Sequence, residues 1–387
     1  GAEALEDFTL KIQKERSIPS SRGNIYDRNG KILAHNKLAY NVTIEDVYEA
    51  KTGKNEALNE TLLKMIHLIE ESGDNIAGNF NIMIDENGNY ADVLVGFDDI
   101  EGFVERTDYQ GVVVGPYANR IGGSSFSIDG VKYNLTANEK DVTCLHSNGE
   151  FNTAVWDAEI INDNSVKFSY VSPDGVNGFP GEIRVSVTYI LTDENELKLE
   201  YSAVSDKKTF INLTNHAYFN LGGYDSGTIL DHIIRIDADK ITPVDEFSIP
   251  TGELMDVEGT AFDLRTGVRI GDSIDCDCDQ LNFTAGYDHN FCINDFDGSV
   301  KLIADVCDPA SGRVLEVYTD LPGVQFYAGN FLKGDIGKAG KPMVRRSGFC
   351  LETQYYPDSP NKPQFPSCLF DAGQEYKTTT IFKFIFK

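Results

Sequence analysis

The spacing of apolar residues changes near residue 80 and divides the chain into two parts. In the first part, the turn signal Asn29-Gly30 precedes a short strand at 31–34, which predicts a β-hairpin, and the alternation over 36–44 predicts a further strand. One helical face over 55–72 carries a row of apolar residues, namely Leu58, Leu62, Met65, Ile66 and Ile69. Gly73 ends this predicted helix. Residues 1–80 are therefore expected to form a small α+β segment.

Residues 81–387 contain short runs in which apolar and polar side chains alternate. Such runs extend from Val166 to Tyr170, from Ile183 to Tyr189 and from Leu197 to Tyr201. Clusters of turn-forming residues separate runs at 173–175, 192–195 and 308–312. The helical pattern ends at about residue 79, and no βαβ rhythm, glycine-rich phosphate loop or fixed repeat follows. This part is predicted to be mainly β, as a large antiparallel β-sandwich, and the pattern gives no support to a nucleotide cofactor.

The same alternation brings polar side chains together on two of these predicted strands. Over 214–220, successive side chains point to opposite faces, so one face carries His216, Tyr218 and Asn220. In the second strand, Glu352 and Gln354 lie on the face opposite Leu351. His216 and Glu352 are therefore a candidate acid and base in a chain with six histidines. Such a polar face either meets water or lines a pocket, and the alternation leaves both open.

The charge balance narrows the range of partners. The chain has 34 basic and 61 acidic residues and a formal net charge of −27, which argues against nucleic acid or an anionic membrane as a partner. No apolar run reaches the roughly 18 residues of a membrane span, and the amino end lacks the features of a signal peptide. A cytoplasmic protein is expected, with an upstream anchor or signal left open.

The seven cysteines are scattered, which favours free thiols in a reducing compartment. Cys276-Asp-Cys278 is too closely spaced for a zinc knuckle and has no second Cys/His pair nearby, so no metal is expected there.

Several motifs in the β part occur in one order along the chain. They are Asp92-Val-Leu-Val-Gly-Phe-Asp98, Tyr117-Ala-Asn-Arg-Ile121, Leu145-His146, Asn177-Gly-Phe-Pro-Gly181, Asn215-His-Ala-Tyr218, Asp288-His-Asn290, Phe326-Tyr-Ala-Gly-Asn330, Ser347-Gly-Phe-Cys-Leu-Glu352 and Pro357-Asp-Ser-Pro-Asn361. Together they resemble the aldose 1-epimerase (galactose mutarotase) family over residues 81–387. The resemblance implies the supersandwich fold of that family.

The resemblance also implies an isomerase that interconverts the α and β anomers of a hexose such as galactose or glucose. By this resemblance Glu352 is the base and His216 the acid, and no metal or cofactor is needed. The implied sugar-binding residues are Asn119, Arg120, His146, Tyr218, Asp288 and Gln325. Neither the sugar nor the oligomeric state follows from the sequence.

Two departures from the family pattern keep an alternative open. Pro116 stands where the family usually has arginine, and Ser147-Asn148 replaces a pair of glycines, so that loop is expected to take another backbone path. The alternative is a non-catalytic carbohydrate-binding protein that retains the sugar pocket.

The amino-terminal part has a resemblance of its own. Residues 16–76, with Ile25-Tyr-Asp-Arg-Asn-Gly30 at their centre, resemble the membrane-proximal segment of class B penicillin-binding proteins. The transpeptidase motifs of that family are absent, so no acyl transfer is implied. Two domains are expected, 1–80 and 81–387, and the role of the first is open. It is an appended module, an envelope assembly piece, or the source of a strand at 36–44 that covers an edge of the sandwich.

Overall fold

The structure is a computed structural model that describes residues 25–26, 32–34, 92–105 and 109–386. Its contacts divide the chain into two units, Gly1–Leu58 and Asn59–Lys387. In the first unit, β1 (Ile25–Tyr26) pairs antiparallel with β2 (Ile32–Ala34), which confirms the hairpin predicted around Asn29-Gly30. The strand predicted at 36–44, the helix predicted at 55–72 and the domain boundary predicted at residue 80 lie outside the described residues.

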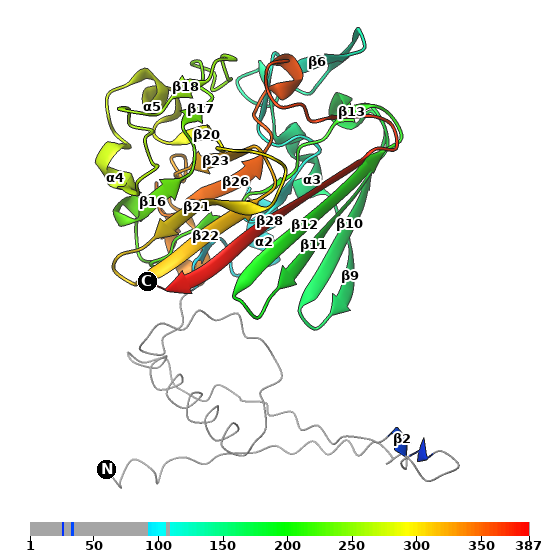
Figure 1. Ribbon diagram of the computed structural model, residues 1–387, viewed down its shortest axis with the longest axis horizontal. Helices are drawn as coiled ribbons and strands as arrows, with labels where there is room; N and C mark the ends of the chain where they lie inside the picture. The colour runs from blue at the N-terminus through cyan, green and yellow to red at the C-terminus, as the bar shows by residue number, and fades with distance from the viewer. Residues whose placement is uncertain (1–24, 27–31, 35–91, 106–108, 387) are drawn as a thin grey trace. The chain divides into compact units, whose positions relative to one another are not determined.

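The second unit contains a nine-stranded antiparallel sheet. In spatial order its strands are β19 (Val268–Arg269), β16 (Ile233–Ile236), β21 (Lys301–Cys307), β22 (Arg313–Thr319), β28 (Glu375–Phe386), β12 (Glu196–Ser205), β11 (Ile183–Leu191), β10 (Ser165–Ser172) and β9 (Asp157–Asn162). Figure 1 shows the last strand of the chain, β28, running between β12 and β22. The alternating runs predicted at 166–170, 183–189 and 197–201 are β10, β11 and β12.

A second, five-stranded sheet packs against the first. Its order is β18 (Met255–Asp256), β17 (Lys240–Ile241), β20 (Asp288–Cys292), β23 (Gly323–Tyr327) and β26 (Cys350–Gln354). Short antiparallel pairs complete the unit: β3 (Leu94–Val95) with β15 (Tyr218–Phe219), β4 (Val113–Val114) with β14 (Thr214–Asn215), β5 (Arg120–Gly122) with β8 (Thr143–Leu145), β6 (Ser125–Ile128) with β7 (Val131–Asn134), β13 (Thr209–Phe210) with β27 (Leu369–Phe370), and β24 (Asp335–Ile336) with β25 (Pro342–Met343).

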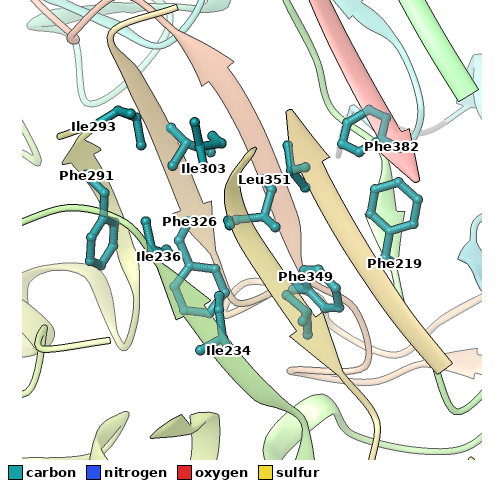
Figure 2. Packing of buried hydrophobic residues seen from close by; sticks show 14 of the residues in the cluster. Phe219, Ile234, Ile236, Phe291, Ile293, Ile303, Phe326, Phe349, Leu351 and Phe382 are labelled. Atoms are coloured by element: carbon teal, nitrogen blue, oxygen red, sulfur yellow. The ribbon is translucent and has the colours of Figure 1, made fainter. Parts of the chain in front are cut away.

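The main hydrophobic core fills the space between the two large sheets. Figure 2 shows Ile234 and Ile303 of the nine-stranded sheet in one layer with Phe291, Phe326 and Leu351 of the five-stranded sheet. All five are almost completely buried. Burial of apolar surface at about 25 cal/mol per Å² is the main favourable contribution to folding, so this layer holds both sheets in place. The mainly β, antiparallel sandwich predicted from the sequence is confirmed.

The helices of the described residues are all short. They are α2 (Ile100–Glu105), α3 (Glu150–Thr153), α4 (Ile270–Ser273) and α5 (Asp279–Thr284), with 3-10 turns η2 (His146–Gly149), η3 (Val176–Gly178), η4 (Ile229–Asp231), η5 (Lys338–Gly340) and η6 (Ser359–Asn361). The expectation that helices end at residue 79 is wrong in this detail, because segments of four to six residues are too short to show a helical repeat. None of the described helices has the length and apolar character needed to cross a membrane.

Candidate active site

One face of the five-stranded sheet is polar, and strand alternation produces it. In β20, Asp288 and Asn290 point to this face, while Phe291 joins the core. In register beside them lie Gln325 of β23 and Glu352 of β26. All of these polar side chains are buried. We call this surface the polar face. Glu352 and Gln354 lie on it and Leu351 lies in the core, as the alternation predicts.

The segment that carries His216 differs from its prediction. The strand expected over 214–220 is two short strands, β14 and β15, with His216 between them. His216 and Tyr218 still lie on one side, with ring centroids 5.1 Å apart, and Phe219 packs in the core. Asn220 does not join them, because its amide donates hydrogen bonds to the backbone carbonyls of Gly227 and Ser347. Asn220 therefore has a structural role.

The predicted acid and base meet above the polar face. His216 Nε2 lies 3.6 Å from Glu352 Oε1, and both side chains are buried. Burial raises the pKa of Glu352 well above its usual range, Asp288 raises it further, and Arg120 opposes them. Burial lowers the pKa of His216 to about 4, against the opposing effects of its own backbone carbonyl and Asp288. Among the described residues, Glu352 Oε2 has no hydrogen-bond partner.

Arg120 is the cation of the site and is held on two sides. Its Nη1 donates to Asp288 Oδ2 at 3.4 Å, and its Nε and Nη2 donate to the two oxygens of Glu139 at 2.8 and 2.9 Å. Burial alone would lower the pKa of Arg120, but Asp288 and Glu139 raise it above its usual range. The other oxygen of Asp288 accepts a hydrogen bond of 2.7 Å from Gln325 Nε2. Arg120 therefore stays charged, and Asp288 is fixed in orientation.

His146 lies beside His216 and is fixed by the backbone. The two ring centroids are 5.4 Å apart, and His146 Nδ1 accepts a 3.1 Å hydrogen bond from the backbone N–H of Asn119. Burial lowers the pKa of His146 well below its usual range, and His216 and Arg120 lower it further. The Asn119 side chain is also engaged, because its Oδ1 accepts a hydrogen bond of 2.8 Å from the backbone N–H of Arg120. The structure thus brings together the eight predicted site residues, Asn119, Arg120, His146, His216, Tyr218, Asp288, Gln325 and Glu352.

Three residues that the sequence analysis did not select also contact this group. Tyr109 lies against both histidines, with ring centroids 4.7 Å from His146 and 5.9 Å from His216. Glu139 accepts a hydrogen bond from the guanidinium of Arg120, and Cys350 Sγ lies 3.5 Å from His216 Nδ1. Alternation could have found Cys350, because it is two residues from Glu352 on the same strand. Glu139 and Tyr109 lie outside the named strands and helices, where no periodic signal exists.

The loop that follows β8 has a left-handed backbone. Ser147 and Asn148 have φ values of 50° and 55°, in the region that glycine favours. Hydrogen bonds hold this conformation. Ser147 Oγ accepts from the backbone N–H of Tyr117 at 2.8 Å and donates to its carbonyl at 3.0 Å, and Asn148 donates to the side chain of Asn177 at 3.2 Å.

A metal ion would fit this site poorly. Within the described part of the chain, His146, His216 and Glu352 are the one group of three or more His, Cys, Asp or Glu residues with ligand atoms close together, all within 4.8 Å. A histidine binds a metal through a nitrogen lone pair. In His146, however, the Nδ1 lone pair receives the Asn119 N–H, so the neutral ring carries its proton on Nε2.

A separate cavity of about 390 Å³ is lined by Met255, Phe262, Cys276 and Cys278, among others. None of the eight predicted site residues lines it. Cys276 and Cys278 join no three-residue ligand group among the described residues, so the structure adds no support for a metal there.

Comparison with known proteins agrees with this geometry. A family model for aldose 1-epimerase matches residues 83–383. The chain belongs to the aldose 1-epimerase family. It is 48% identical over 302 residues to galactose mutarotase from Rattus norvegicus, with 78% of this chain and 86% of the relative covered. It is 37% identical over 301 residues to aldose 1-epimerase from Escherichia coli K12, with 77% and 86% covered.

The fold of this aldose 1-epimerase family member also matches solved structures. A GalM/aldose epimerase homologue from C. elegans superposes with a TM-score of 0.72 at 30% identity, over 79% of this chain and 91% of the other. A second family model, the penicillin-binding protein dimerisation domain, matches residues 17–121. This match confirms the resemblance noted for the amino-terminal part. It also overlaps the start of the epimerase match, so both family models match residues 83–121 of this chain.

Proposed function

We propose that this family member interconverts the α and β anomers of a hexose such as galactose or glucose, with Glu352 as the base and His216 as the acid. The observation that carries the proposal is the approach of His216 Nε2 to Glu352 Oε1 at 3.6 Å, with Glu352 Oε2 left for a ligand hydroxyl. Relatives named galactose mutarotase support galactose as a substrate.

The reaction needs one base and one acid at opposite ends of a hemiacetal. Glu352 takes the proton of the anomeric hydroxyl while His216 Nε2 protonates the ring oxygen, and the bond between C1 and the ring oxygen breaks. Rotation about the C1–C2 bond presents the other face of the aldehyde. The ring then closes as Glu352 returns its proton to the carbonyl oxygen and His216 takes back the proton of the attacking hydroxyl.

One exchangeable proton is therefore shared by the pair throughout the cycle. In the ring-closed complex Glu352 is ionised and His216 is protonated, and ring opening leaves both groups uncharged. Burial raises the pKa of Glu352 and lowers that of His216, so it favours the uncharged pair. Arg120 opposes this preference by stabilising the ionised carboxylate. Burial and Arg120 therefore act in opposite directions on the charge state of the pair.

The remaining polar groups supply hydrogen bonds for the sugar hydroxyls. Arg120 has five N–H donors and uses three of them on Glu139 and Asp288, which leaves two for a ligand. His146 offers an Nε2–H donor because its Nδ1 is occupied. The carboxylate of Asp288 offers an acceptor, and the neighbouring Gln325 offers its side-chain amide. Asn119 and Tyr218 complete the proposed set.

Polarimetry on a freshly dissolved α-anomer tests the proposal. We expect the wild type to accelerate mutarotation and Glu352→Gln to lose it by about 100-fold or more, the range of general acid-base catalysis. Glu182→Gln is the matched control, because Glu182 forms an exposed ion pair with Arg184, outside the proposed site. Decay at the wild-type rate with Glu352→Gln would show that another group is the base.

The same measurements address the carbohydrate-binding alternative. Calorimetry that shows sugar binding, together with wild-type polarimetry that shows no acceleration, would replace the enzymatic proposal with the binding function.

A further inference from the structure

The two histidines of the site have different partners at Nδ1. His146 Nδ1 lies 3.1 Å from the backbone nitrogen of Asn119. A backbone N–H can only donate, so this Nδ1 must accept. The neutral ring of His146 therefore carries its proton on Nε2. It can give a hydrogen bond at Nε2 but has no lone pair there to receive a proton.

His216 Nδ1 lies in a different environment, 3.5 Å from Cys350 Sγ. A thiol sulfur can accept a hydrogen bond, and the backbone carbonyl of His216 also favours a proton on this ring. His216 Nε2 faces Glu352 Oε1 at 3.6 Å. With a proton retained on Nδ1, Nε2 is the nitrogen that gives and receives the exchangeable proton.

We propose that Cys350 is a positioning residue whose sulfur accepts the Nδ1–H of His216 and holds His216 in the tautomer opposite to that of His146. His216 then exchanges protons through Nε2, whereas His146 is confined to donating a hydrogen bond. The catalytic consequence rests on the proposed function, and the tautomer assignment does not.

The thiol suits this position because it is an acceptor without charge. Cys350 is fully buried, and burial, with further contributions from Glu352 and Asp288, raises the pKa of its thiol well above the usual range. The sulfur therefore stays protonated. A carboxylate at the same place would stabilise the imidazolium form of His216 and so weaken it as an acid. Cys350 fixes the ring and leaves the proton free to move.

Besides Cys350 and the backbone carbonyl of His216 itself, none of the groups recorded around the ring is placed at Nδ1. Glu352 faces Nε2, His146 meets the ring edge to face, and Tyr109, Tyr218 and Tyr327 contact it as rings. The charge of Asp288 raises the pKa of His216, and the charge of Arg120 lowers the pKa of His146.

Nitrogen-15 NMR of the histidine rings in the sugar-free full chain tests the tautomers directly. We expect His216 to carry its proton on Nδ1 and His146 to carry its proton on Nε2. In Cys350→Val, which removes the acceptor at similar volume, we expect a mixture of His216 tautomers and a kcat about tenfold lower with little change in KM, the size of one lost hydrogen bond. Cys350→Ser restores an acceptor and should recover most of the Nδ1–H tautomer of His216 and most of the kcat.

Cys368→Val is the matched control, because Cys368 is buried in a core cluster that contains none of the eight site residues. It should leave tautomers and kcat unchanged. A wild-type His216 with its proton on Nε2 overturns the proposal, as does Cys350→Val with unchanged tautomers and kcat. If Cys350→Val does not fold, the wild-type spectrum decides. Failure of the proposed function would appear separately, as absence of wild-type mutarotation in polarimetry.

Discussion

At the scale of single residues, Glu352 and His216 titrate as one unit. They are 3.6 Å apart and both buried, so the pKa values observed by experiment belong to the pair. The active form holds one proton. A second proton enters only below the lowered pKa of His216, about 4. The single proton leaves only above the raised pKa of Glu352. Activity should therefore persist across neutral pH and fall on both sides.

The alkaline limit of this profile depends on Asp288. The negative charge of Asp288 raises the pKa of Glu352, so Asp288→Asn should lower that pKa and move the alkaline limb of the kcat profile to lower pH. KM should rise as well, because Asp288 orients Arg120 and Gln325. Rates of mutarotation measured across pH check the shift, with Asp305→Asn, whose partner is Arg235, as the control. An alkaline limb that stays in place or moves upward would contradict this account.

At the scale of elements, the connection between β7 and β8 holds the side chain of Arg120 in position. This connection carries Glu139, which binds two nitrogens of Arg120 and is itself partly exposed. In Glu139→Gln one oxygen becomes an amide donor that cannot accept from Arg120, so the bidentate contact is lost. We expect KM for the sugar to rise about five- to tenfold, the cost of a charge-assisted hydrogen bond, with a smaller change in kcat.

Steady-state kinetics by polarimetry check this split between KM and kcat. Glu182→Gln again serves as the control, since it removes an exposed ion pair outside the site. An unchanged KM would mean that Asp288 alone is sufficient to place Arg120.

Elements also show what the sequence could and could not predict. Alternation located β10, β11 and β12 because each is at least eight residues long and faces the core on one side. It also placed Glu352 correctly, because successive side chains of the five-residue strand β26 alternate between the polar face and the core. It joined β14 and β15 into one strand, because two-residue strands give no period of their own. The sequence did not predict Glu139 and Tyr109 as site residues, because their contacts with the site are long-range and are made by irregular segments.

At the scale of the whole molecule, the described core and the described site belong to the same part of the chain. The hydrophobic clusters draw their buried members from positions between Val95 and Phe382. The eight predicted site residues lie between Asn119 and Glu352, and the epimerase family match covers 83–383. We therefore propose that residues 81–387 form the catalytic domain and that residues 1–80 are an appended segment.

Deletion of residues 1–80 tests this division of the chain. Because the described core clusters and all eight site residues remain, we expect the shortened protein to unfold in one cooperative transition and to keep the kcat and KM of the full chain. Calorimetry and polarimetry on both forms measure these quantities. Aggregation or a loss of stability would contradict this division, because it would show that the removed residues contribute to the folding of the remainder. Edge strand β9, whose six residues are all exposed, is where pairing between chains would begin, because an uncovered sheet edge promotes it.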